Sequence, residues 1–293
     1  MTSRVDSLLI ALLIVSVLLG ATLLVLGLEP VRRGRVERFV ERTGVTITAS
    51  SAPYVVDALT RTRRWRFSAV LVAVSGCVAW NIVANSSTFT TFMGEAVAVA
   101  VLVGTLVGEL RNAAVRGDAP RTASLVARRE SQYVGNWASI GPRVLAVAAI
   151  VLGVLTALRH PDDLVAPLVF GGVAVVAWLV SRAATRFVLE RPRCADPDPD
   201  VLMADAGLRS RALHAIGGAT WFVSLWSVAP LAVFPLMSGT EEVNSGLALL
   251  LWVGLIAAAI AAWRLAAQPF PVAELDARRA DHLDEPASEA TAP

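Results

Sequence analysis

Long runs of apolar residues alternate with polar segments along the chain. The first run, residues 7–28, has no charged residue in 22 positions, which is enough for a helix to cross about 30 Å of hydrocarbon. These runs are apolar on every side, whereas a helix of a soluble core needs only one apolar stripe. The pattern therefore predicts an all-α polytopic membrane helix bundle of about seven transmembrane helices, at roughly 7–28, 67–85, 90–110, 143–158, 164–181, 215–237 and 246–263.

The polar segments predict the orientation of this bundle. All 26 basic residues are arginine, and 24 of them lie in segments 29–66, 111–143, 182–213 and 264–293. Segments rich in arginine stay on the cytoplasmic side of a membrane. We therefore expect a multi-pass protein of the inner (cytoplasmic) cell membrane, with the N-terminus outside and the C-terminus cytoplasmic. Residues 1–267 would form the transmembrane domain, and residues 268–293 a disordered cytoplasmic tail.

Two stretches of the first basic segment have the spacing of short amphipathic helices. In 31–44, Val36, Phe39 and Val40 form an apolar stripe that Gly44 terminates. Ser51 can cap a second short helix. We expect both helices to lie at the inner membrane surface with their apolar sides toward lipid, the alternative being a solvated linker.

The segment "RPRCADPDPDVLMAD" (191–205) concentrates acidic residues without matching a metal site. A calcium-binding loop that started at Asp196 would need glycine and glutamate where Val201 and Gly207 stand. We interpret the segment as a capped loop, with Asp200 as the helix cap and Asp205 paired with Arg209 one turn later. No metal or cofactor is expected.

The inner segments also carry a resemblance. "RTASLVARRESQYVGNW" (121–137) and "PDVLMADAGLRSRALHAIGG" (199–218) together resemble a group of uncharacterised multi-span membrane proteins of actinobacteria, for which no activity is established. The matching positions are Arg121, Ala123, Ser124, Leu125, Tyr133 and Trp137, then Pro199, Asp200, Ala204, Asp205, Arg209 and His214. The resemblance covers about a third of the chain and implies a multi-span membrane protein.

A stripe of small residues predicts a helix-packing face in the third span. Ala96, Ala100, Gly104 and Gly108 recur every four residues, and small side chains let another helix backbone approach closely. The partner is either a neighbouring span or a second copy of the chain. Leu102 would face outward.

Glu95 is the charged residue placed deepest in any predicted span, and Asn81 of the preceding span is its candidate partner. Three interpretations remain open: an interfacial glutamate that reaches outward, a polar contact between helices, and a proton-coupled site. Glu109 is placed at the inner edge beside Arg111, where it can reach water.

The sequence contains no pattern that indicates catalysis. No span places a serine or cysteine within reach of a base, and no glycine-rich phosphate loop is present. We expect a non-enzymatic accessory or permease-like membrane component, the alternative being a small-solute or proton-coupled transporter. Its expected partners are the lipid bilayer and either another membrane protein or a second copy, rather than nucleic acid, because membrane orientation already accounts for the arginines.

Overall fold

The computed structural model describes residues 33–84, 89–114, 130–159, 161, 164–191, 198–237 and 245–275. All regular secondary structure in these residues is helical. The helices are α2 (Arg33–Thr43), α3 (Ala52–Ala84), α4 (Phe89–Ala114), α5 (Glu130–Tyr133), α6 (Asn136–Arg159), α7 (Val165–Glu190), α8 (Pro199–Met237) and α9 (Ser245–Ala266). The expected first span, 7–28, lies outside the described residues.

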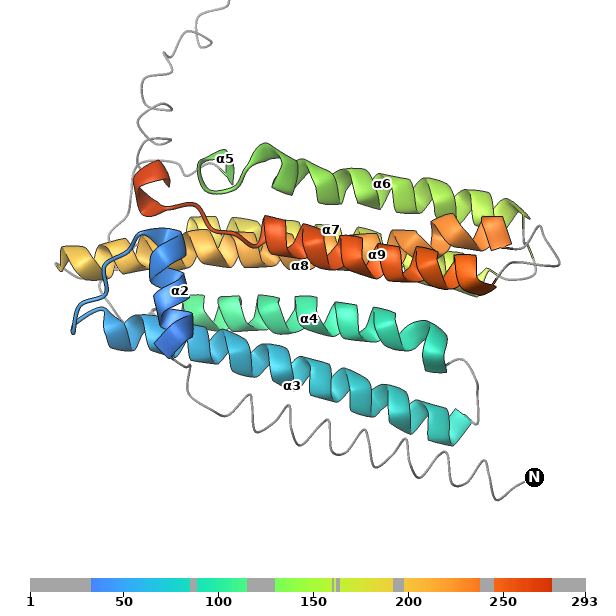
Figure 1. Cartoon of the computed structure of the whole chain (residues 1–293), viewed down its shortest axis with the longest axis horizontal. Coiled ribbons are helices and arrows are strands. Elements are labelled where there is room, and N and C mark those ends of the chain that lie inside the picture. Colours follow the sequence, from blue (N-terminus) through green and yellow to red (C-terminus); the bar gives the residue numbers. More distant parts are fainter. Residues whose placement is uncertain are drawn as a thin grey trace, which may run out of the picture.

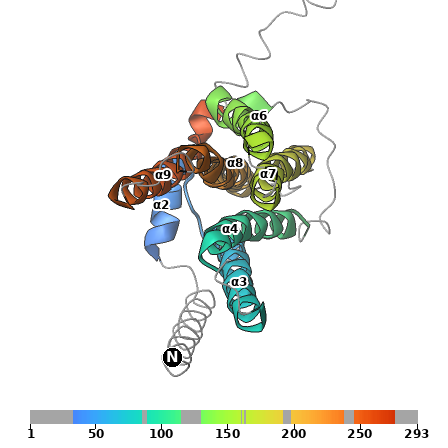
Figure 2. The same ribbon diagram turned by 90° about the vertical axis from the view of Figure 1, so that its right-hand side faces the viewer.

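The long helices run side by side, with α8 in the middle of them (Figures 1 and 2). Helix α8 packs against α3, α4, α6, α7 and α9. Its buried side chains, among them Leu213, Ile216 and Val223, form much of the main apolar core. A helix with five neighbours has little surface left for solvent or lipid, which explains why α8 is buried along most of its described length.

Three of the described helical stretches are long and apolar enough to cross a membrane: Asn136–Arg159, Pro167–Glu190 and Pro199–Ala232. Large apolar side chains on the outer faces of α6 and α7 point away from the bundle, and Leu158 and Leu168 are 75% and 69% exposed. Apolar side chains on an outer surface suit contact with lipid rather than water. The chain is therefore a membrane protein, whereas the count of seven spans and their orientation remain predictions.

Two helices are longer than the sequence pattern suggested. The short helix expected after Ser51 and the span expected at 67–85 are one helix, α3, of 33 residues. Helix α8 likewise begins at Pro199 and runs on through the span expected at 215–237. Arginine and alanine have high helix propensity, and the segments between the polar starts and the spans contain no proline that would break a helix.

Helix α2 lies across the long helices, near one end of the bundle (Figure 1). Gly44 ends it with a φ of 65°, as expected for a glycine that follows a helix. The prediction that its apolar side faces lipid is wrong. Phe39 is buried against Val55 of α3 and Leu208 of α8, because packing on these two helices removes its ring from water.

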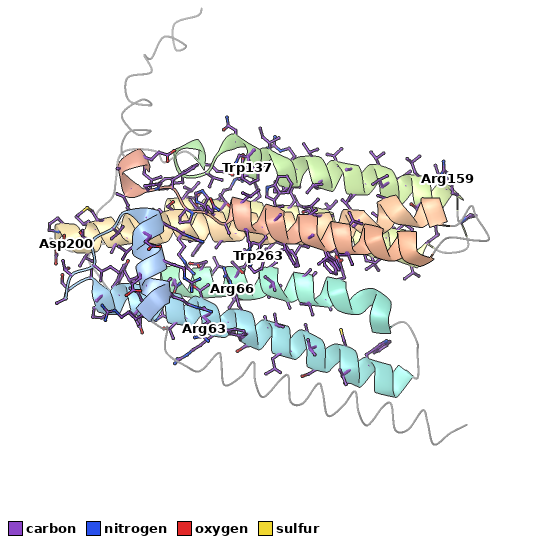
Figure 3. All side chains as sticks on the ribbon, in the orientation of Figure 1. Arg63, Arg66, Trp137, Arg159, Asp200 and Trp263 are labelled. Atoms are coloured by element: carbon purple, nitrogen blue, oxygen red, sulfur yellow. The ribbon has the colours of Figure 1, made fainter. Side chains whose placement is uncertain are left out.

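The arginine-rich ends of the helices lie at the same end of the bundle. We call this the basic end, and Figure 3 labels Asp200 at its tip, Arg63 and Arg66 between that tip and the middle of the bundle, and Arg159 at the opposite end. Alternating helix directions produce this arrangement, since α3 and α8 start at the basic end while α4, α7 and α9 run toward it (Figure 1). The first residues of the expected tail, 268–275, pack back onto the basic end, where Leu275 is buried.

Candidate functional site

Asp205 is the centre of a buried ionic cluster at the basic end. The Tyr54 hydroxyl donates to Asp205 Oδ1 over 2.8 Å, and Arg209 Nη2 donates to Oδ2 over 3.2 Å. Arg191 also donates to Oδ1. The predicted Asp205–Arg209 pair is therefore confirmed, although it is buried rather than solvated. The cluster ties α3, α8 and the end of α7 together.

The cap of α8 is Asp198, so the assignment of Asp200 is wrong by two residues. Asp198 Oδ1 accepts a hydrogen bond from the Asp200 backbone N–H over 2.9 Å, and its Oδ2 accepts one from the Ser50 hydroxyl over 2.6 Å. These bonds hold the pKa of Asp198 below its usual value, with the Ser50 bond making the largest contribution. Pro199 takes the first helical position, where its fixed φ is favourable.

Several residues of the resemblance gather around α8, while Arg121, Ala123, Ser124 and Leu125 lie outside the described residues. Tyr133 is buried in the main core. His214 is buried with its Nδ1 2.9 Å from the Ser210 carbonyl oxygen. Its ring packs edge-on against Phe270 at 4.9 Å between centroids. These contacts are structural, because each places a side chain against the core or a backbone carbonyl.

Glu109 belongs to a second buried polar cluster, between α3, α4 and α8. Its Oε1 accepts hydrogen bonds from Thr62 Oγ1 over 3.0 Å and from Arg211 Nη1 over 3.3 Å. Asn112 Nδ2 donates to Thr62 Oγ1 over 2.9 Å. The expectation that Glu109 reaches water beside Arg111 is wrong, because Glu109 is only 5% exposed and faces inward.

The small-residue stripe of α4 lies against the backbone of α3. A methyl group on Gly104 would sit 2.6 Å from Arg66 Cα, and one on Gly108 would sit 2.8 Å from Thr62 Cα. Contacts this short with backbone atoms cannot be relieved by side-chain rotation. The neighbouring helix that approaches the glycines is thus α3.

The rest of the α4 surface is more enclosed than the stripe suggested. Ala100 is buried and Ala96 is half-buried. Leu102 was expected to face outward, but it is buried in the main core. Helix α4 packs against α7 and α8 as well as α3, so a residue opposite the stripe still meets protein.

Glu95 lies between α4 and α8, with 4% of its surface exposed. The Ser227 hydroxyl donates to Glu95 Oε1 over 2.5 Å. Glu95 Oε2 and the Ser224 hydroxyl are buried without a hydrogen-bond partner among the described residues. The side chain of Asn81 is not among those described, so the Asn81–Glu95 pairing remains a prediction. The polar partner that the structure places beside Glu95 is Ser227.

A pocket of about 810 Å³ opens at the basic end, bounded by α2, α3, α4, α8 and α9. Apolar side chains, including Phe67, Val70 and Trp263, form part of its wall. Figure 3 labels Arg63 and Arg66 of α3 and Trp263 of α9 in this region. Seven arginines line it: Arg35, Arg38, Arg42, Arg63, Arg66, Arg211 and Arg264.

We call this pocket the arginine pocket. Its arginines interact electrostatically, and the effect is seen at Arg66. Burial and the positive charges of Arg211 and Arg35 together lower the pKa of Arg66 to about 10, against the raising effect of Glu109. Arg66 Nε donates to Thr105 Oγ1 over 2.8 Å, which fixes the side chain at the wall. The pocket is thus strongly electropositive.

No group of three or more histidine, cysteine, aspartate or glutamate side chains in the described part of the chain is arranged to hold a metal ion. Comparison with known proteins gives no further lead, because no family model, curated protein or solved structure matches this chain. The function therefore has to be inferred from the two buried clusters, Glu95 and the arginine pocket.

Proposed function

We propose that this chain is a non-enzymatic, seven-span component of the inner cell membrane, either an accessory protein or a permease-like subunit. The observation that carries the proposal is that the two buried carboxylates at the basic end are already hydrogen-bonded within the protein. Asp205 and Glu109 each accept hydrogen bonds from an arginine and a hydroxyl group inside the bundle. A catalytic base must instead face a site that a substrate can reach.

The arrangement of charge supports the proposed orientation. In the described part of the chain, the helix ends that adjoin the arginine-rich segments lie toward the basic end (Figure 1). Arginine-rich segments are retained in the cytoplasm. The basic end would then face the cytoplasm, with the C-terminus on the same side.

Complementation tests the non-enzymatic assignment. We would express Asp205→Asn and Glu109→Gln in a strain that lacks its own copy, and measure both relative fitness and the amount of protein in the membrane. If the two carboxylates are structural, fitness should fall only as far as the amount of protein falls. A variant present at the wild-type amount that fails to restore fitness would contradict the proposal.

A small-solute or proton-coupled transporter is the second candidate, and Glu95 favours it. Carriers place ionisable groups inside the membrane, and Glu95 is a buried carboxylate that accepts a hydrogen bond from the hydroxyl of Ser227. In a carrier, Glu95→Gln should fold normally while transport is lost. If Glu95 is a packing contact, the same variant should retain full function.

A further inference from the structure

The arginine pocket has a marked excess of positive charge. Among the described residues that line it, seven are arginines and none is an aspartate or glutamate. Glu109 bonds to Arg211 from behind the wall over 3.3 Å, which offsets one of these charges. Four of the seven arginines, Arg35, Arg38, Arg42 and Arg264, are exposed, and clustered positive charge of this kind attracts anions. The pocket therefore suits an anionic group.

The arginines reach this space from elements that are far apart in the sequence. Three come from α2, two from α3, and one each from α8 and α9. Membrane orientation explains why arginines are numerous in these segments, but it requires only that they lie on one side of the membrane. It does not require side chains from four helices to line one pocket.

Polar and apolar side chains follow the same order along three of these helices. On α3, Arg63 and Arg66 precede Phe67 and Val70 in the direction of the expected span. On α8, Arg211 precedes Ala215, and on α9, which runs the other way, Trp263 precedes Arg264. Phe67, Val70 and Trp263 therefore line the pocket nearer the middle of the bundle than the neighbouring arginines do, while Leu59 lines it on the side of the basic end.

An amphiphile with a phosphate group matches this order. The guanidinium group binds phosphate oxygens through paired N–H donors, and basic pockets between transmembrane helices suit anionic headgroups. A volume of about 810 Å³ lies in the usual range for small-molecule sites. A free phosphate ion would use the arginines but leave the apolar wall uncovered.

We propose that the arginine pocket binds the phosphate-bearing headgroup of an anionic membrane lipid, with Arg63 and Arg66 contacting the phosphate and the apolar wall contacting the start of the acyl chains. The proposal deepens the proposed function and rests on it, since it requires the basic end to lie at the membrane surface. It makes the chain a lipid-binding membrane component.

The test uses the full-length protein, purified in a neutral detergent. Dioctanoyl phosphatidylglycerol, dioctanoyl phosphatidylcholine and inorganic phosphate are titrated separately, and binding is measured from the shift in thermal unfolding temperature and from bound lipid in native mass spectrometry. We expect saturable binding of phosphatidylglycerol and much weaker responses to phosphatidylcholine and to phosphate. An equal response to phosphatidylcholine, or to inorganic phosphate at the same concentration, would overturn the assignment of an anionic lipid.

Matched variants connect that binding to the pocket. Arg63→Gln combined with Arg66→Gln should weaken phosphatidylglycerol binding by roughly tenfold or more for each arginine, since each supplies a charge-assisted hydrogen bond. Arg64→Gln is the control, because Arg64 is exposed and does not line the pocket. If the double variant binds as tightly as wild type, the proposal is wrong.

A second pair of arginine substitutions keeps the test informative if the Arg63→Gln, Arg66→Gln double variant does not fold. Arg42 and Arg264 are exposed at the rim on different helices, so replacing both with glutamine should preserve the fold and still weaken binding. Unchanged binding in this pair would count against the pocket. If the wild-type protein fractionates with membranes but shows no saturable phosphatidylglycerol binding, the pocket assignment falls and the proposed function stands.

Discussion

Replacing Gly104 with leucine should destabilise the bundle by forcing α3 and α4 apart. Even the first added carbon would lie 2.6 Å from Arg66 Cα and 2.7 Å from the Trp65 carbonyl oxygen. Comfortable contacts between such atoms begin near 3.5 Å, so the helices must separate by about 1 Å. Overpacking of this kind costs about 1–3 kcal/mol. A 1 Å gap along α3 and α4 also forfeits about a quarter to a half of their dispersion contacts.

The matched control is Gly76→Leu on α3, because a Cβ on Gly76 would meet nothing within 4 Å. Both substitutions gain about 1 kcal/mol of helix propensity, so their difference isolates the packing effect. A net loss of about 2 kcal/mol should lower the unfolding temperature of the detergent-purified protein by roughly 4–8 °C for Gly104→Leu, while Gly76→Leu should not lower it. Equal unfolding temperatures for the two variants would refute the reasoning.

Substitutions at three further residues test the buried polar groups. Asp205→Asn should cost about 3–5 kcal/mol of unfolding free energy, because it leaves Arg209 and Arg191 buried without a carboxylate; a loss below about 1 kcal/mol in chemical denaturation would show that the cluster is solvated. Tyr54→Phe should cost less, about 0.5–1.5 kcal/mol, since it removes one neutral donor. Glu95→Gln should keep the wild-type melting temperature, whereas Glu95→Leu should lower it, because only glutamine can still accept from Ser227. If neither Glu95 variant changes stability or fitness, Glu95 has no role in packing or transport.

The apolar runs predicted the positions of the long helices because membrane insertion depends on local composition. Each of the expected spans from 67–85 onward overlaps one of the helices α3, α4, α6, α7, α8 and α9. Where those helices begin was harder to predict. The polar residues 52–66 look like surface sequence, yet they continue α3 because nothing in them breaks a helix and their arginines find partners in the bundle.

The hydrogen-bond partner of Glu95 could not be predicted from the sequence. Asn81 was the natural candidate because a short turn makes neighbouring spans antiparallel. Ser227 is 132 residues away, and no local spacing indicates that α8 packs against α4 there. Long-range pairs of this kind depend on which helices are neighbours in the bundle, and hydropathy does not determine that.

Apart from Arg209, which is predicted to pair with Asp205, the arginines are interpreted from the sequence as signals of orientation. That interpretation treats each segment separately, so it could not predict that α2 crosses the long helices and brings its arginines beside those of α3 and α8. The apolar stripe of Val36, Phe39 and Val40 is the local signal, since apolar residues among arginines must be buried somewhere. Whether the stripe faces lipid or protein depends on the fold.

The most direct test is to determine which side of the membrane each end of the bundle faces. Arg159→Cys and Arg264→Cys, each in a background with both natural cysteines replaced by serine, place a single thiol at opposite ends of the bundle. A membrane-impermeant thiol reagent should label Arg159→Cys in intact cells and should label Arg264→Cys only after the cytoplasmic side is opened. Labelling of Arg264→Cys in intact cells, or identical labelling of the two variants, would contradict a membrane-spanning bundle with its basic end in the cytoplasm.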